Sequence, residues 1–141
     1  ASGTTTDGML GELGLAHRAD AYPAAISGGE RQRTALARSL VLDPDVLLLD
    51  EAAGALDAVT RERIQELLLR IRSERRLTMV VVTHDIEEAV TLGERIGILR
   101  DGRIVREIEN PAFETPPARF TPRFAEVERI VRDALEPEAR P

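Results

Sequence analysis

The chain has 141 residues, of which 43% are hydrophobic and 31% charged, and its formal net charge is −6. This size and balance suit one globular domain, and no apolar run is long enough for a transmembrane helix. The negative charge argues against general binding to nucleic acids, and the absence of cysteine excludes disulfides and thiolate metal sites. Nothing at the start is typical of a signal peptide, so we expect a reducing, cytoplasmic setting.

Lysine is absent, so arginine supplies all 19 basic residues. A phosphate-binding P-loop needs a lysine whose ammonium group reaches the phosphates. The sequence therefore contains no P-loop. Because it also begins with alanine rather than methionine, we expect a fragment, or a chain whose upstream part is missing.

The first predicted elements are a short helix and a loop. Apolar residues at helical spacing indicate a helix from Gly8, and Gly14 is the glycine expected to end it. A loop through Tyr22-Pro23 follows.

Ser27 is predicted to begin the next helix. A serine followed three positions later by Glu30 is the pattern of a capping box, and apolar i,i+4 pairs continue the helix to about Val41. The unpaired amides and the dipole at such a helix start favour an anion. Ser27-Gly28-Gly29 is therefore either a capped helix start alone or an anion site.

The middle of the chain predicts the first half of a βαβ unit and the strand after it. Residues 46–49 form a short apolar run that favours a buried parallel strand, and Asp57 is a predicted N-cap of a helix to about Ser73. The β-branched residues 78–82 predict the second strand.

The next segment predicts a short helix and a hairpin. Asp85 and Glu88 form a second capping pair, for a helix that reaches Leu92. Residues 95–99 and 104–108 are predicted strands around Asp101-Gly102, a dipeptide that favours a type I′ turn.

The end of the chain predicts a linker and one last helix. Prolines mark the linker, and Thr121 with Pro122 forms the N-cap and first position of the helix. The apolar face of this helix holds Phe124, Val127, Ile130, Val131 and Leu135.

Two positions after predicted strands carry groups suited to phosphate chemistry. Asp50 and Glu51 are able to hold Mg²⁺ and to polarise a water molecule, or they only cap the following segment. His84 is able to hydrogen-bond a phosphate, or it is an ordinary surface or core histidine. His17 has no such context, and two distant histidines make no metal site.

Four motifs together resemble the ATP-binding cassette (ABC) ATPases. The first is similar to the signature motif and its helix: Ile26-Ser27-Gly28-Gly29-Glu30-Arg31-Gln32-Arg33, with Ala35, Ala37 and Arg38. Residues 46–51 resemble the Walker B motif, Ala55-Leu56-Asp57 resembles the D-loop, and His84, 34 residues beyond Asp50 (84 − 50), resembles the switch histidine. Ile26, Glu30 and Ala52 replace the family's commoner Leu, Gln and Pro.

The resemblance implies an α/β fold. We expect an incomplete P-loop NTPase-like domain, with a parallel sheet flanked by helices, part of the helical signature subdomain, and a C-terminal helix. The expected division is a remnant of the helical subdomain at 1–44, the ATPase core with Walker B, D-loop and switch histidine at 45–110, and a linker with the last helix at 111–141. The strand at 78–82 is expected to have a bare far edge, where the P-loop strand of the family would pair.

The resemblance also implies roles, because two ABC ATPase domains enclose two ATP molecules head to tail. Asp50 would hold Mg²⁺, Glu51 would activate water and His84 would contact the γ-phosphate of ATP on their own domain. Asp57 would communicate with the partner across the dimer. The signature residues would reach the partner's ATP instead: Ser27, Gly28, Gly29 and Glu30.

The implied partners are a second ABC ATPase subunit, membrane permease subunits and, indirectly, a periplasmic or extracellular solute-binding protein. The implied location is peripheral, at the inner face of the cell membrane. The D-loop, the segment at residues 83–89 and the tail from Thr121 are most similar to importers of nitrate, sulfonate and taurine.

Two alternatives stay open. The first is a non-catalytic module that supplies its signature motif in trans to a P-loop partner. The second is a non-transport ABC protein of DNA repair or translation, which the acidic balance and the lack of a basic arm disfavour.

Overall fold

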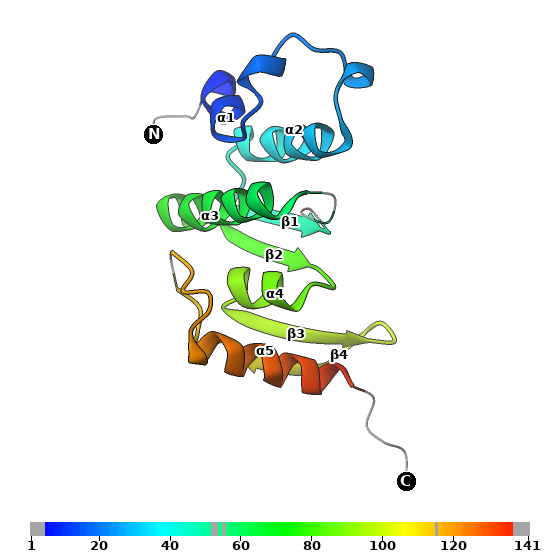
Figure 1. Ribbon diagram of the computed structural model, residues 1–141, viewed down its shortest axis with the longest axis vertical. Coiled ribbons are helices and arrows are strands. Elements are labelled where there is room, and N and C mark those ends of the chain that lie inside the picture. Colours follow the sequence, from blue (N-terminus) through cyan, green and yellow to red (C-terminus); the bar gives the residue numbers. More distant parts are fainter. Residues whose placement is uncertain (1–4, 52–53, 55, 115, 137–141) are drawn as a thin grey trace. The chain divides into compact units, whose positions relative to one another are not determined.

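A computed structural model of the chain describes residues 5–51, 54, 56–114 and 116–136. The chain divides into two compact units, residues 1–82 and 83–141 (Figure 1). The three-part division expected from the sequence, at 1–44, 45–110 and 111–141, stays a prediction.

The first unit begins with the predicted short helix, α1 (Thr6–Glu12). Gly14 lies in the left-handed region at φ 66°, as expected of the glycine that ends a helix. The N–H of Gly14 donates to the Gly11 carbonyl at 3.0 Å, and the N–H of Leu15 donates to the Leu10 carbonyl at 2.7 Å. This pair of hydrogen bonds is a Schellman motif. The predicted loop that follows contains two 3₁₀ turns, η1 (Ala16–Arg18) and η2 (Pro23–Ala25).

Helix α2 (Gly28–Val41) has the bounds predicted from the capping box. It packs against α1 through side chains that are buried on both helices (Figure 1). The most deeply buried of these are Met9 and Leu40, each with no exposed surface. Because α1 precedes the segment with η1 and η2 and α2 follows it, this packing holds both ends of that segment.

The predicted βαβ pattern is present. Strand β1 (Val46–Asp50) is parallel to β2 (Thr78–Val82), and helix α3 (Ala58–Arg75) connects them. Asp57 is the N-cap of α3, as predicted, and the predicted helix face is buried: Ile64, Leu67, Leu68 and Ile71.

The expectation that β1 is buried on both faces is wrong. Leu47 and Leu49 are buried, but Val46 and Leu48 are 53% and 73% exposed. Val80, the partner of Leu48 in the register, is also exposed. The reason is that, within the described residues, packing covers only one face of this two-stranded sheet. In the same residues β2 pairs with β1 alone, which confirms the expected bare edge.

The second unit contains α4 (Ile86–Leu92), β3 (Arg95–Arg100), β4 (Arg103–Glu109) and α5 (Pro122–Leu135). Asp85 and Thr121 are N-caps, as predicted: each side chain accepts a hydrogen bond from a backbone N–H in the first turn. Strands β3 and β4 pair antiparallel around Asp101 and Gly102, whose φ angles of 49° and 76° confirm the type I′ turn.

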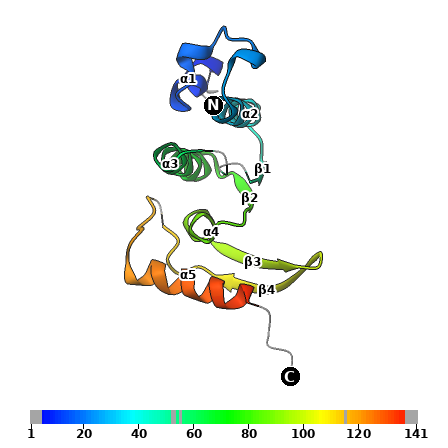
Figure 2. The ribbon, with the colours of Figure 1, turned by 45° about the vertical axis from the view of Figure 1, so that its right-hand side comes forward.

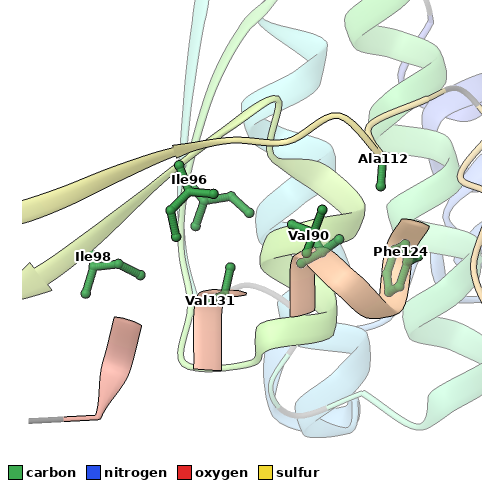
Figure 3. Close-up of a cluster of buried hydrophobic side chains, with 8 residues drawn as sticks. Val90, Ile96, Ile98, Ala112, Phe124 and Val131 are labelled. Carbon is green, nitrogen blue, oxygen red and sulfur yellow. The ribbon is translucent and has the colours of Figure 1, made fainter. Parts of the chain in front are cut away.

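Helix α5 completes the core of the second unit, where it packs against α4 and β3 (Figures 1 and 2). Figure 3 shows part of this cluster, which consists of Val90, Ile96, Ile98, Ile108, Ala112, Phe124, Val127 and Val131. Leu135, expected on the buried face of α5, is 47% exposed, because it is the last helical residue and lies beyond Val131, the last buried one.

Asn110 joins three parts of the second unit, and the sequence analysis missed it. Its side-chain N–H groups donate to the carbonyls of Val90 and Gly93, each at 2.7 Å, at the end of α4. Its side-chain oxygen accepts from the N–H of Ala112 at 3.0 Å. Asn110 is 6% exposed, so the backbone groups that it pairs would have little access to water if its side chain were removed.

Replacing Asn110 by alanine is expected to destabilise the second unit by about 1–3 kcal/mol, because buried carbonyl groups lose their donors. Chemical denaturation followed by circular dichroism measures the change. The control is Glu109→Ala at an exposed neighbouring position, which should stay within about 0.5 kcal/mol. Equal effects of the two substitutions would contradict the role of Asn110.

Candidate functional site

The capping box at the start of α2 is formed as predicted. The Oγ of Ser27 accepts from the N–H of Glu30 at 3.2 Å, and Oε2 of Glu30 accepts from the N–H of Ser27 at 2.7 Å. The N–H groups of Gly28 and Gly29 occupy the first two helical positions, where helix geometry provides no intrahelical acceptor. The hydroxyl proton of Ser27 also remains available to donate. This helix start therefore offers two amides and one hydroxyl to an anion.

Glu30 is held more firmly than a capping residue alone would be. It is 9% exposed, and its Oε1 accepts from Nε of Arg18 at 3.0 Å. Nε2 of His17 lies 3.6 Å from the same oxygen. Two hydrogen bonds lower the pKa of Glu30 to about 2: the one from the Ser27 N–H has the larger effect, and the one from Arg18 comes next. Glu30 therefore carries a full negative charge at neutral pH.

The charge of Glu30 predicts a pH dependence of stability. The folded pKa of about 2 lies below the ordinary value of 4.5, so the stabilisation is complete above about pH 4.5 and is lost as the pH falls towards 2. We therefore compare the free energy of unfolding of the unmodified chain with that of Glu30→Gln. The difference between the two should be constant from pH 7 to about pH 5 and should decrease below pH 5. Urea titrations at each pH measure it. A difference that stays constant down to pH 2.5 would contradict this prediction.

A cation lies beside the same helix start. Arg31 donates through Nη1 to the Ile26 carbonyl at 2.6 Å. Its Nη2 lies 3.9 Å from the position that a Cβ on Gly28 would take. The sequence analysis named Arg31 only as a member of the signature-like motif. A signal was present, because a cation in the first turns of a helix opposes the helix dipole.

The two predicted carboxylates lie at the carboxyl end of β1. Asp50 is its last residue and is exposed, and Glu51 follows with φ at 47°, an uncommon backbone conformation for a residue other than glycine. The Glu51 N–H donates to the Val82 carbonyl at 2.9 Å, and the Glu51 carbonyl accepts from the N–H of Gly54 at 3.2 Å. Backbone hydrogen bonds thus fix the turn that carries Glu51.

Gln32 connects this turn to the signature helix. Its Nε2 donates to the Glu51 carbonyl at 3.1 Å, across 19 residues of sequence. The first unit therefore brings the start of α2 and the Asp50-Glu51 turn together. The sequence analysis did not find this contact, because nothing in the local pattern indicates the partner of a helix glutamine.

The other two predicted site residues, Asp57 and His84, are not part of this hydrogen bond. Asp57 accepts from the N–H of Thr60 at 3.0 Å as the N-cap of α3, and hydrogen bonding to Thr60 lowers its pKa. His84 belongs to the second unit, where it is exposed between β2 and α4. The positions Ala52 and Ala55, in the turn after Glu51 and in the predicted D-loop, lie outside the described residues.

The residues present are suited to hold a magnesium ion only if phosphate oxygens supply some of its ligands. No group of three or more histidine, aspartate or glutamate side chains that could hold a metal ion occurs in the part of the chain that the structure describes. In phosphate-transfer sites, however, Mg²⁺ is held by one or two carboxylates together with phosphates and water. The exposed carboxylates of Asp50 and Glu51 suit that arrangement.

Comparison with known proteins identifies the class. Residues 2–54 match the ABC transporter family. The chain is 48% identical over 127 residues to an aliphatic sulfonates import ATP-binding protein of Mesorhizobium japonicum, and 51% identical over 128 residues to one of Burkholderia thailandensis. Each alignment covers 90% of this chain, but 48% and 38% of the respective relative.

Solved structures agree. The dimeric structure of an ATP-binding cassette in a post-hydrolysis state, bound to ADP and Pi, is 43% identical, with a TM-score of 0.68 over 72% of this chain and 44% of that chain. A dimeric bacterial ABC transporter cassette gives a TM-score of 0.69 at the same identity, over 74% of this chain and 45% of that chain.

The fold and motifs thus define a P-loop NTPase-like α/β protein. More narrowly, the chain belongs to the ABC ATPase family. It spans about half the length of the curated relatives it matches. None of the described helices is long and apolar enough to cross a membrane.

Proposed function

We propose that this chain forms part of the ATP-binding and hydrolysing subunit of an ABC importer. One observation carries the proposal: the hydrogen bond from Gln32 to Glu51 joins a capped, anion-ready helix start to a turn with two carboxylates. Family membership supports the same assignment.

The Asp50-Glu51 turn would serve ATP bound to the same domain. When bound, Mg²⁺ neutralises phosphate charge and orients the phosphates. Asp50 would hold this ion through its carboxylate, and Glu51 would accept a proton from the attacking water. The backbone hydrogen bonds of Glu51 fix the turn that carries this side chain. His84 would contact the γ-phosphate.

The start of α2 would serve the ATP of a partner subunit. Its Ser27 hydroxyl and the amides of Gly28 and Gly29 would donate to the γ-phosphate, and Arg31 would add positive charge beside Gly28. Asp57 would lie at the same dimer contact. Dimeric ATP-binding cassettes among the solved relatives support a pair of subunits, which the family resemblance implies to be head to tail.

The solute of this importer would be an aliphatic sulfonate, because the relatives at 48% and 51% identity carry that function in their names. Hydrolysis would power uptake through permease subunits that receive the solute from a binding protein outside the membrane. The chain would lie at the cytoplasmic face of the membrane, held by the permease.

A second candidate function is a non-catalytic module that supplies its signature motif in trans. Such a module would depend on its partner's P-loop lysine for the β- and γ-phosphates, because the 141 residues contain no lysine. In this case the anion site of α2 operates, whereas Asp50 and Glu51 have no ATP of their own.

The purified chain is expected to hydrolyse ATP no faster than its Glu51→Gln variant, because a catalytic base without a P-loop has no positioned substrate. A coupled phosphate-release assay with Mg²⁺ measures steady-state turnover. Turnover clearly above that of Glu51→Gln would show a phosphate site other than a P-loop and contradict the assignment of roles.

Association with a partner tests the proposed function directly. The partner is the P-loop-bearing ATPase domain of a sulfonate-importer relative, with its own catalytic glutamate replaced by glutamine so that ATP persists. Analytical ultracentrifugation should detect a complex of the two chains with Mg²⁺ and ATP, and none with ADP. Equal association with both nucleotides, or with neither, would contradict the proposal.

A further inference from the structure

The signature helix of this chain has an electrostatic problem at its start. A helix N-terminus attracts anions, and Glu30 already places one there, in the third helical position. Its carboxylate accepts from the N–H of Ser27 at 2.7 Å, next to the amides of Gly28 and Gly29. A phosphate that approaches those amides must therefore approach a fixed carboxylate as well, and like charges repel at this range.

The structure contains a cation that offsets this charge. Arg18, in η1, donates from Nε to Oε1 of Glu30 at 3.0 Å, while the other carboxylate oxygen faces Ser27. The side chain of Glu30 is 12% exposed and that of Arg18 is 45% exposed, so solvent reaches this pair from the arginine side only. The pKa of Glu30, lowered to about 2 by the hydrogen bonds from Ser27 and Arg18, means that the carboxylate is ionised at neutral pH.

We propose that Arg18 is a positioning residue for the trans nucleotide site: it neutralises Glu30, and this allows the Ser27-Gly28-Gly29 helix start to accept the phosphates of a partner's ATP. The inference rests on the proposed function and deepens it. Arg18 lies 12 residues before Glu30, in a segment to which the sequence analysis assigned no role.

Neighbouring charges do not replace Arg18. The Nε2 of His17 lies 3.6 Å from the same carboxylate oxygen, but the His17 side chain is 63% exposed, and its charge is present only when the ring is protonated. Arg31 lies beside Gly28 and donates to the Ile26 carbonyl, and the described contacts do not place it on Glu30. Arg18 is thus the cation that the described contacts place directly on this carboxylate.

The first test measures the carboxyl group itself. A ¹³C-detected NMR titration of Glu30 should give a pKa of about 2 in the unmodified chain. In Arg18→Gln the pKa should rise towards its ordinary value, while the Ser27 hydrogen bond keeps it below that value. An unchanged pKa in Arg18→Gln would overturn the inference, whatever the nucleotide experiments show.

The second test is a double-mutant cycle on ATP-dependent association with the P-loop partner. Arg18→Gln is expected to weaken association at least tenfold when Glu30 is present, and less than twofold when Glu30→Gln is also present. Arg18→Lys should restore most of the affinity, because it restores the charge. The matched control is Arg70→Gln, which breaks a similar arginine–carboxylate pair, with Glu12 at 3.2 Å, and should change nothing.

The outcomes separate the two proposals. Equal weakening by Arg18→Gln in both backgrounds would overturn the inference, since Arg18 would then act on the fold or on ATP directly. No weakening in either background would overturn it as well. If the unmodified chain shows no ATP-dependent association although the Glu30 pKa shifts as expected, the proposed function is what fails, and the role of Arg18 towards nucleotide falls with it.

Discussion

Phe124→Ala is expected to destabilise the second unit by about 3–5 kcal/mol, because it removes a large side chain from the centre of a packed cluster. Phe124 is 4% exposed and belongs to the cluster that joins α5 to α4 and β3 (Figure 3). A loss of this size is a large fraction of the stability of a small domain. Hydrogen exchange of the β3 amides, followed by NMR, measures the change within this unit.

The matched control for Phe124 is the same substitution four residues earlier. Phe120 is 93% exposed, so Phe120→Ala removes no buried surface and should change stability by less than about 0.5 kcal/mol. If β3 exchanged at the same rate in the two variants, α5 would not be part of the core.

Gly28→Asp is expected to weaken ATP-dependent association with a P-loop partner about 10–100-fold without loss of stability. A Cβ on Gly28 meets only Nη2 of Arg31, at 3.9 Å, so the side chain fits. An acidic residue in the first turn stabilises a helix by about 0.3–1 kcal/mol. The same carboxylate repels a phosphate and displaces the charge-assisted hydrogen bonds, which are each worth about 1.5–3 kcal/mol.

The control for Gly28→Asp is Gly11→Asp on α1, where a Cβ meets nothing within 4 Å. It makes the same change of charge in the same unit, away from the signature helix start. Thermal unfolding should show Gly28→Asp at least as stable as the unmodified chain. If both variants bound equally well, the start of α2 would not contact nucleotide.

Local sequence chemistry predicted most of the helix boundaries. Capping residues such as Ser27, Asp57 and Thr121 satisfy amides within three residues of themselves, so the pattern and the structure depend on the same short-range hydrogen bonds. The hairpin at Asp101-Gly102 was predictable for the same reason, because the turn requires two residues that tolerate positive φ.

Contacts between distant segments were not predictable. Gln32 reaches Glu51 across 19 residues, and Arg18 reaches Glu30 across 12, and neither partner is marked by spacing or composition. Asn110 follows a strand and is typical of a turn residue, yet it fixes the end of α4. Such contacts exist only once packing has brought the elements together.

Burial of β1 was the clearest error. The run Val46-Leu47-Leu48-Leu49 is apolar on both faces, which is typical of a strand covered on both sides. In the structure Leu48 is 73% exposed. The hydrophobic pattern of a strand indicates whether its faces are suited to burial. Whether they are buried depends on which other segments are present to cover them.

Isothermal titration calorimetry with Mg²⁺ and ATP tests the trans role most directly. The chain is titrated alone and then mixed with the arrested P-loop domain. The expected result is no heat of binding for the chain alone, and ATP-dependent heat of association in the mixture beyond that of the P-loop domain by itself. ATP binding by the chain alone, or a mixture that only sums the two separate titrations, would contradict a signature helix that contacts the partner's nucleotide.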